Sequence, residues 1–413
     1  MTSYEFLEGR IAMRKVLTAV LFLYVLSVAT ASFAQPKKVF LTNGNKRPEN
    51  SIFAPGISVG KTVYVAGKGD YKPDEDMEGK VRNCLNEVRK VLKRADLDYE
   101  NIVKCWCYLE DPTLYPEFNR VYSEFFKGDP PARTTLGVPE VPGDSEIEIT
   151  VIATSDKSKK RIGDPIDGFP FSHGIQADGT LYISGKGDQL PGGGHPETFE
   201  EQVRQAMKNV GVVLEEAGLS YENVVFSSVY VDNYDNQGIV NKVYSEFFEY
   251  GNEPARSTVF VDWIPGGSHV EITCIAATDL SKREVVRPKS MSYGPTGAAM
   301  TASPAVWNGD TLYTSGIAGE VAWEGITTVD LTAQATQMSE NVIDVLGAAG
   351  LDLSNIVSGC VYLRNINDYA AFNEVYRPYF SQGPGVRTCL MPNSGYEKND
   401  VRCRSSFIAA RTK

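Results

Sequence analysis

Histidine is the scarcest ionisable residue of this sequence. The 413 residues contain three histidines, at positions 173, 195 and 269, and none recurs at an equivalent position of the repeat described below. This excludes a repeated Ser-His-Asp or Cys-His arrangement and a repeated metal site built on histidine. The glycine-rich stretch at 191–194 lacks the strand-to-helix context of a phosphate loop or a dinucleotide fingerprint, and we interpret it as a hairpin loop. The chemistry must therefore come from other side chains.

Blocks of one charge sign are also absent. The net charge of −11 is spread along the chain, with no basic block of the kind that binds nucleic acid. A pI near 5.0 argues against a phosphate-binding face as the main working surface. We therefore expect no nucleic-acid partner, and the apolar content of 42% is typical of a soluble globular protein.

Long apolar runs are absent except for one near the N-terminus, at residues 16–28. Basic residues precede it, and Ser32-Phe-Ala34 follows it with small residues at the first and third positions. This order is typical of a secretory signal peptide, so we expect residues 1–34 to be removed and the protein to be exported to a periplasmic or extracellular compartment. An uncleaved membrane anchor is the alternative, because the run approaches spanning length. Met1 and Met13 are both candidate starts, and after cleavage we expect no membrane contact.

Cysteine is present as an odd set that does not recur between the repeats, so a repeated disulfide framework is not expected. Two of the seven lie two positions apart on one face of a predicted strand, where a bond between them is sterically poor. We interpret most of them as buried thiols. The seven are Cys84, Cys105, Cys107, Cys274, Cys360, Cys389 and Cys403.

The sequence contains three copies of one unit. Each copy has an aromatic motif, an asparagine two positions before it and an arginine after it. The motifs are Val-Tyr-Ser-Glu-Phe-Phe at 121–126 and 243–248 and Val-Tyr-Arg-Pro-Tyr-Phe at 375–380; the asparagines are Asn119, Asn241 and Asn373, and the arginines are Arg133, Arg256 and Arg387. The spacing of about 120–130 residues is too long for a solenoid unit and fits a small domain. We therefore predict three modules, at residues 35–157, 158–281 and 282–413, of which the third is degenerate.

Each module is predicted to have the element order β-β-α-β-α-β-β. In module 1, apolar residues recur at helical spacing over 81–92, and a strand-like run follows at 102–109. A second helix carries the aromatic residues Phe118, Tyr122, Phe125 and Phe126, and further strands are expected near 62–66, 134–138 and 146–153. This order predicts an α+β fold with one sheet per module and both helices on one face of it.

An arginine at the start of a strand, followed about 15 residues later by a glutamate, recurs in modules 1 and 2. The pairs are Arg133 with Glu148 and Arg256 with Glu271. A guanidinium at a partly dry strand end suits bidentate binding of a small carboxylate. A carboxylate facing the same cleft can hold a water or transfer a proton. The alternative is a cross-strand salt bridge that binds no ligand.

Two segments resemble the C-terminal signature of the reactive intermediate deaminase (RidA, YjgF-like) family, whose name is sometimes linked to a ribonuclease activity. They are Pro-Ala-Arg-Thr at 131–134 and Pro-Ala-Arg-Ser at 254–257, each followed by a strand, a Pro-Gly turn and Ile-Glu-Ile or Val-Glu-Ile. The resemblance runs from about residue 38 to the C-terminus. It includes Ser184 and Ser315, each before a glycine, the three asparagines, and Phe53 and Phe171 where the family commonly has a tyrosine.

The resemblance implies a RidA- or chorismate-mutase-like fold, with the modules as an intramolecular pseudo-trimer around a central β-barrel and sites in the clefts between neighbours. One chain would then be a monomeric unit. It also implies hydrolysis of 2-imino and enamine acids to 2-oxo acids and ammonia, without metal or cofactor. The arginines would bind the substrate carboxylate, Glu148 and Glu271 would position the water, and the serines, asparagines and phenylalanines would complete the substrate site.

The copies also depart from the family. Module 1 has Ala66 in place of the serine, and module 3 has Arg404 in place of the glutamate, which cannot act as a base at neutral pH. Lys68 and Lys186 add positive charge after the serine-glycine position, either for an anionic ligand or as solvated loop lysines. We therefore expect two reaction sites, formed by the arginine–glutamate pairs of modules 1 and 2, and a third that at most binds. The sequence does not fix which copies share a cleft.

Three functions compete. The first is an exported imine or enamine deaminase. The second is a non-catalytic protein that binds a small carboxylate or metabolite, which Ala66 and Arg404 favour. The third, a ribonuclease, is disfavoured by the acidic chain and by the lack of a repeated histidine or basic-aromatic surface.

Overall fold

The computed structural model describes residues 35–42, 44, 46, 51–70, 72, 74–143, 145–166, 168–291, 301–321, 325–393 and 400–412. The predicted signal peptide at 1–34 lies outside the described residues. Residues 37–413 form one compact unit. Within the described part of the chain, no helix has the length and apolarity needed to cross a membrane.

Module 1 contains one mixed sheet and two helices. Its elements are β1 (Lys38–Phe40), β2 (Gly56–Val59), β3 (Thr62–Gly69), α2 (Met77–Leu92), β4 (Ile102–Leu109), α3 (Tyr115–Ser123), β5 (Ala132–Gly137) and β6 (Ile147–Thr154). The strand order is β1-β2-β3-β6-β4-β5, with β4 and β5 parallel and the other neighbours antiparallel.

Modules 2 and 3 repeat this plan with two seven-stranded sheets. Module 2 contains β7 (Lys160–Ile162), β8 (Gly174–Ala177), β9 (Thr180–Ile183), β10 (Lys186–Gly187), α4 (Phe199–Glu216), β11 (Val224–Val231), α5 (Gln237–Ser245), β12 (Ala255–Phe260) and β13 (Val270–Ala277). Module 3 contains β14 (Arg283–Val286), β15 (Ala305–Asn308), β16 (Thr311–Thr314), β17 (Ile317–Ala318), α6 (Leu331–Ala348), β18 (Ile356–Leu363), α7 (Tyr369–Phe380), β19 (Val386–Leu390) and β20 (Cys403–Ala410).

The predicted α+β fold and its threefold repetition are confirmed. The structure adds a short edge strand at the start of each module, β1, β7 and β14, which the sequence analysis did not predict. The second helix of module 1 is also shorter than the aromatic pattern suggested. It ends at Ser123, so Phe125 and Phe126 follow the helix and pack against the same core from outside it.

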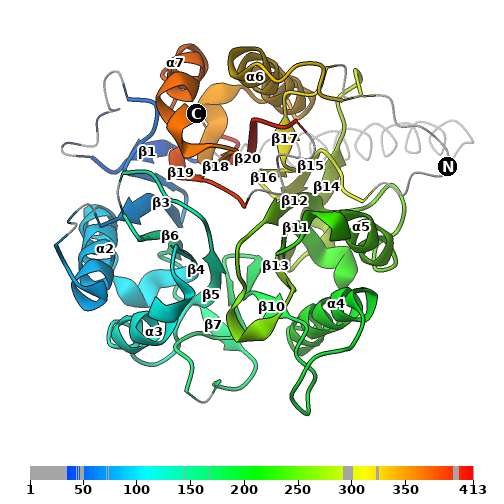
Figure 1. The fold of residues 1–413 in the computed structure, drawn as a ribbon. Coiled ribbons are helices and arrows are strands. Elements are labelled where there is room, and N and C mark those ends of the chain that lie inside the picture. Colours follow the sequence, from blue (N-terminus) through cyan, green and yellow to red (C-terminus); the bar gives the residue numbers. More distant parts are fainter. Residues whose placement is uncertain are drawn as a thin grey trace, which may run out of the picture. The chain divides into compact units, whose positions relative to one another are not determined.

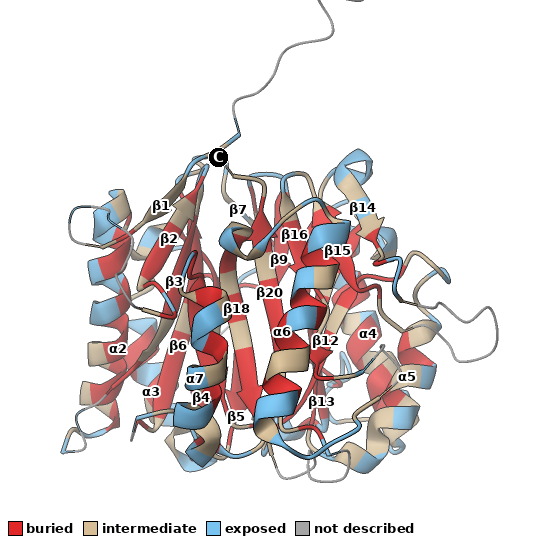
Figure 2. Ribbon diagram, turned by 90° about the horizontal axis from the view of Figure 1, so that it is seen from above, coloured by how far each residue is buried: buried red, intermediate tan, exposed pale blue. Residues whose placement is uncertain are grey.

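The helices cover one face of each sheet. Side-chain caps start the long helices: Asp76 accepts a 2.9 Å bond from the N–H of Gly79, and Thr198 and Asp330 cap α4 and α6 in the same way. The apolar stripe of α2 lies against the sheet with no solvent exposure at Val81, Leu85 or Val88. Each such side chain contributes about 1.5–3 kcal/mol to folding. Figure 2 shows buried residues on the strands and exposed ones on the outward helix faces.

The other faces of the three sheets share one core. It includes Tyr64 from module 1, Tyr182 from module 2 and Tyr313 from module 3, which are all buried. The expectation of a central β-barrel is corrected: the ladders of the described strands stay within each module, and the modules are connected by isolated bridges outside these ladders, such as the one between Ala132 and Ser172. The inner faces thus meet by side-chain packing. Figure 1 shows the strands of the three modules toward the centre, with the helices outside them.

All seven cysteines are free thiols, and six of them are buried. The exception is Cys360, which is partly exposed. This agrees with the expectation of buried thiols without a repeated disulfide framework. Burial raises the pKa of the Cys105 thiol to about 11, so this thiol is kept protonated and unreactive near neutral pH.

Candidate functional site

The three arginines of the repeat lie where one module meets the next. The backbone N–H of Arg133 in module 1 donates a 2.8 Å hydrogen bond to the hydroxyl of Ser184 in module 2. The N–H of Gly185 donates in return to the carbonyl of Arg133 at 3.0 Å. These two bonds connect the first residues of β5 with the segment that follows β9. The arginine side chain is therefore fixed at the cleft between modules 1 and 2, which we call cleft 1–2.

The guanidinium of Arg133 is held by its own module. Its Nη2 donates to Asn119 Oδ1 at 2.7 Å and to the Tyr115 hydroxyl at 3.2 Å. The ring of Phe171, from module 2, lies 4.8 Å from the guanidinium carbon and closes it from the other side. The buried Nη1 has no hydrogen-bond partner among the described residues. One arm of the guanidinium is thus positioned by protein, and the other is available to a ligand.

Glu271 of module 2 faces the same pocket as Arg133. Its side chain is buried, and its Oε1 has no hydrogen-bond partner among the described residues. A Cβ atom on Gly185 would lie 1.8 Å from this oxygen, so only glycine leaves room for the carboxylate. Burial raises the pKa of Glu271 to about 7, and the nearby Lys104, Arg133 and Lys186 oppose the rise. The carboxyl group can therefore exchange a proton near neutral pH.

Lys186 and His173 form a further pair in this pocket. Lys186 Nζ lies 2.5 Å from His173 Nδ1. Burial lowers the pKa of Lys186 to about 8 and, together with the lysine charge, that of His173 to about 4. The imidazole is thus neutral, and its Nδ1 accepts a hydrogen bond from the Lys186 ammonium group. Lys186 lies on β10, so the alternative of a solvated loop lysine is wrong. The pocket has a volume of about 580 Å³, which suits a small metabolite.

Arg387 and Glu148 form the corresponding pair at the cleft between modules 3 and 1, cleft 3–1, although here Nη1 and Nη2 of the arginine both have protein partners. Arg387 donates to Asn373 Oδ1 at 2.8 Å and to the Tyr369 hydroxyl at 2.9 Å, and Phe53 of module 1 lies 5.3 Å from its guanidinium carbon. Burial raises the pKa of Glu148 to about 8, against the opposing charges of Lys68 and Arg387. Ala66 offers no hydroxyl to the arginine backbone here.

Cleft 2–3, between modules 2 and 3, has the same frame without the glutamate. Arg256 donates its backbone N–H to Ser315 Oγ at 2.8 Å and its Nη2 to Asn241 Oδ1 at 2.6 Å. Arg404 occupies the strand position of the glutamates: it pairs with Tyr362, as Glu271 pairs with Tyr230 and Glu148 with Tyr108. This cleft therefore contains two arginines.

The structure thus pairs the predicted residues differently from the sequence analysis. Each arginine meets the glutamate position of the following module. Glu271 lies with Arg133 in cleft 1–2, and the charge of Arg387 opposes the rise in the pKa of Glu148 in cleft 3–1. The expected pairs within modules 1 and 2 are wrong, and Arg256, which was expected to have a glutamate, lies in the cleft that lacks one. The physical reason is that the arginine-bearing edge strand of each sheet lies against the next module.

Two residues of the candidate site were missed. Tyr115 and Tyr369 both hold an arginine, and their recurrence four positions before the asparagines in modules 1 and 3 was a signal that could have found them. His173 was set aside because it does not recur, yet it contacts Lys186 in the pocket. Among the described residues, no group of three or more His, Cys, Asp or Glu side chains is arranged to hold a metal ion.

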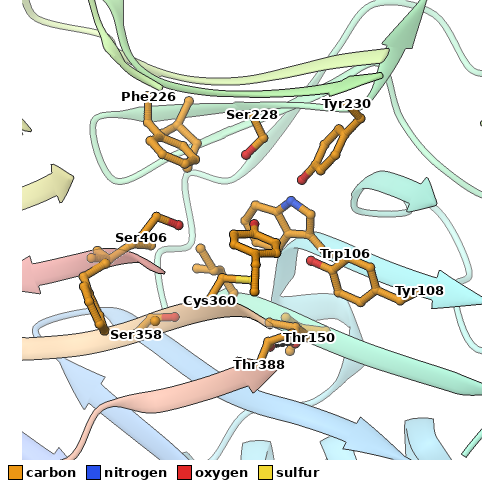
Figure 3. Close-up of a pocket in the computed structure, with 17 residues that line it drawn as sticks. Trp106, Tyr108, Thr150, Phe226, Ser228, Tyr230, Ser358, Cys360, Thr388 and Ser406 are labelled. Carbon is orange, nitrogen blue, oxygen red and sulfur yellow. Dashed lines mark hydrogen bonds between the residues drawn. The ribbon is translucent and has the colours of Figure 1, made fainter. Parts of the chain in front are cut away.

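A second pocket lies where the inner faces of the three modules meet (Figure 3). Strands of all three contribute to it, and its lining contains hydroxyls, aromatic rings and one thiol without an Arg, Lys, Asp or Glu side chain. Its labelled residues are Trp106, Tyr108, Thr150, Phe226, Ser228, Tyr230, Ser358, Cys360, Thr388 and Ser406. The volume of about 70 Å³ is small for an organic ligand. The clefts that contain the arginines are therefore the better candidates.

Comparison with known proteins supports the fold described above and shows the family to which the chain is similar. A family model described as endoribonuclease L-PSP matches residues 45–155, 165–278 and 296–391, which is one match in each module. A mouse protein named 2-iminobutanoate/2-iminopropanoate deaminase is 39% identical over 109 residues, covering 26% of this chain and 80% of the mouse protein. The rat protein of the same name is 37% identical over 134 residues, and the match covers 32% of this chain and 92% of the rat protein.

A solved structure titled chorismatase matches a larger part of the chain. The match covers 75% of this chain and 93% of the chorismatase chain, with a TM-score of 0.54 and 13% sequence identity. At this identity the likeness concerns the fold alone.

Proposed function

We propose that this chain, which belongs to the endoribonuclease L-PSP family and contains three RidA-like (YjgF-like) copies, hydrolyses 2-imino and enamine acids to 2-oxo acids and ammonia. The names of the mouse and rat relatives support this reaction class. The observation that carries the proposal is the pocket that holds Arg133 and Glu271, each with one buried polar atom that has no partner among the described residues.

In cleft 1–2 each residue has a separate role in the proposed reaction. The free Nη1 of Arg133 binds the substrate carboxylate, while Asn119 and Tyr115 keep the guanidinium in place. The Glu271 carboxylate accepts a proton from water as the water oxygen bonds to the C=N carbon. The C=N nitrogen is protonated beforehand and takes up the π electrons, so a carbinolamine forms. The protonated carboxyl then gives its proton to the amine nitrogen, the C–N bond breaks as the hydroxyl oxygen forms the carbonyl, and the carboxylate accepts the hydroxyl proton. An electrophilic imine needs little beyond positioning and one acid–base group.

Cleft 3–1 is the second proposed reaction site, with Glu148 as the proton acceptor and Arg387 as the cation for the substrate carboxylate. The two Nη atoms of Arg387 already donate to Asn373 and Tyr369, so the carboxylate would share them. Lys186 and Lys68 lie next to the two glutamates and add positive charge for an anionic substrate. Glu148 has the higher pKa, about 8 against about 7 for Glu271, so the two sites differ in the pH at which the carboxylate forms.

Ammonia release from freshly generated 2-iminopropanoate tests the reaction. We expect wild type to accelerate it over buffer, and the double variant Arg133→Ala, Arg387→Ala to lose at least about 100-fold in kcat/KM. Arg204→Ala, on the outer face of α4, is the control, because its guanidinium makes only exposed ion pairs. No acceleration by wild type would leave the alternative, a non-catalytic carboxylate-binding protein.

Two further properties are part of the proposal. One chain is the functional unit, a monomeric pseudo-trimer, because its own modules supply both sides of each cleft. Light scattering would contradict this if the particle contained three chains. Export follows from the predicted signal peptide, and cell fractionation with N-terminal sequencing of the mature protein tests it.

A further inference from the structure

Cleft 2–3 keeps the backbone frame of the other clefts. Ser315 Oγ accepts the N–H of Arg256 at 2.8 Å, and the N–H of Gly316 donates to the carbonyl of Arg256 at 2.9 Å. These bonds match those between Arg133 and module 2. Arg256 is also held through Nη2 by Asn241. The scaffold that positions an arginine for an anionic group is therefore intact here.

The second arginine enters this cleft from the other wall. A Cβ atom on Gly316 would lie 3.1 Å from Cδ of Arg404, just as one on Gly185 would meet the carboxylate of Glu271. Arg404 thus passes the same glycine as the glutamates and projects toward the arginine. Burial lowers the pKa of Arg256 to about 10, and the positive charge of Arg404 adds to this effect. The two guanidinium groups repel each other, and no acidic group of the described residues is among the charges that act on Arg256.

Both arginines have unused donors. Arg256 Nη1 and Arg404 Nε are buried and have no hydrogen-bond partner among the described residues. Neither side chain forms an ion pair within the described part of the chain, although many surface arginines of this protein do, for example Arg82 and Arg120. Buried unpaired donors of like charge are destabilising, and an anion between them would satisfy both.

The rest of cleft 2–3 differs from the proposed reaction sites in a consistent direction. The N–H of Ser303 donates to the carbonyl of Pro254 across the junction. Ala302 lies directly before Ser303 and therefore occupies the place that Phe171 has in cleft 1–2. Ile317 takes the place of Lys186 in the strand register. Gln237 stands where modules 1 and 3 have a tyrosine. The cleft has lost its aromatic cover, its carboxylate and its lysine, and has gained a guanidinium.

We propose that cleft 2–3 is a non-catalytic site for a small organic dianion, a dicarboxylate or a phosphate monoester, bound between the guanidinium groups of Arg256 and Arg404. Two forked donors match two anionic groups or the several oxygens of one phosphate. No carboxylate remains to activate water, so the ligand is bound and released unchanged. This site is independent of the proposed imine hydrolysis.

Isothermal titration calorimetry on the full chain at fixed ionic strength tests the site, with succinate, inorganic phosphate and acetate as probes. We expect one dianion to bind at least about tenfold more tightly than acetate. Succinate as the tighter probe identifies a dicarboxylate site, and phosphate identifies a phosphate-ester site. If neither dianion binds more tightly than acetate, the proposal is wrong.

Variants locate the binding. Arg404→Gln should weaken the preferred dianion at least about tenfold, whereas Arg204→Gln, on the outer face of α4 and outside all three clefts, should retain it. Equal retention in the two variants would overturn the assignment. If circular dichroism shows that Arg404→Gln does not fold, Arg404→Lys replaces it. That variant keeps the charge and removes the fork, so it should still weaken binding, and unchanged affinity would count against the site.

Discussion

The hydroxyl of Ser184 accepts a 2.8 Å hydrogen bond from the backbone N–H of Arg133 across the junction of modules 1 and 2. The same hydroxyl donates to the carbonyl of Ser172 at 2.5 Å. The serine of the family resemblance therefore bonds to the backbone of the arginine. Its contribution is to fix the strand that carries the substrate-binding side chain, and Ser315 does the same for Arg256.

Ser184→Ala should destabilise the protein by about 1–3 kcal/mol, because it leaves the buried N–H of Arg133 without an acceptor. Urea unfolding measures the loss. Ala66→Ser at the junction of modules 3 and 1 is the complementary variant, since it restores a hydroxyl at the equivalent position. Ser184→Ala would contradict the role of this bond if the free energy of unfolding changed by less than about 0.5 kcal/mol.

Glu148→Gln and Glu271→Gln should each remove one of the two reaction sites and leave the other. In each single variant the remaining site keeps a substantial part of the ammonia release, whereas the double variant should fall by about 100-fold or more. Steady-state kinetics with 2-iminopropanoate measures this. If one single variant were as inactive as the double variant, turnover would have to come from one cleft alone.

The pH dependence should separate the two clefts. Glu271 has a raised pKa of about 7 and Glu148 one of about 8, both because of burial. A glutamate that accepts the proton of water works as the carboxylate, so kcat/KM rises with pH through its pKa. Glu148→Gln, which leaves Glu271, should therefore have its midpoint about one pH unit lower than Glu271→Gln.

The comparison of the two variants cancels the ionisation of the substrate, which is common to both. The retained activity of each must be followed from pH 5.5 to 9.5 with the same imine source. Superimposable profiles, or the reverse order of midpoints, would mean that these carboxylates do not set the rate as bases.

The fold was predictable from the sequence because its signals are local. The helix stripe that includes Val81 and the strand Ile102–Leu109 show their periodicity within a few residues, and the structure reproduces the latter with the same bounds. The threefold repetition of such signals made the module plan clear. The edge strands β1, β7 and β14 were missed because three or four residues carry too little pattern.

The composition of the clefts was not predictable in the same way. Whether Arg133 meets Glu148 or Glu271 depends on which module packs beside which, and that is decided by contacts between sheet faces far apart in the chain. The sequence indicated that module 3 lacks a glutamate. It did not indicate that this loss affects the arginine of module 2. That is established by the position of Arg404 beside Gly316 and by the effect of its charge on Arg256.

Lys104 provides a last prediction, about the junction itself. It is fully buried, and its Nζ donates to Thr134 Oγ1 at 2.8 Å and, in module 2, to Ile183 O at 2.8 Å and Thr273 Oγ1 at 2.7 Å. Burial lowers its pKa to about 7 from 10.5. Between these values the unfolded chain binds more protons, so this lysine makes stability rise with pH over that window.

Lys104→Met should remove this dependence. Urea unfolding at pH 7 and pH 9.5 should show that the stability of wild type relative to the variant increases by about 3 kcal/mol at the higher pH. Lys208→Met, at an exposed position of α4, is the matched control and should show no such change. A difference between wild type and Lys104→Met that is the same at both pH values would mean that the lysine stays charged at the junction. Its three acceptors would then stabilise the ammonium ion enough to offset its burial.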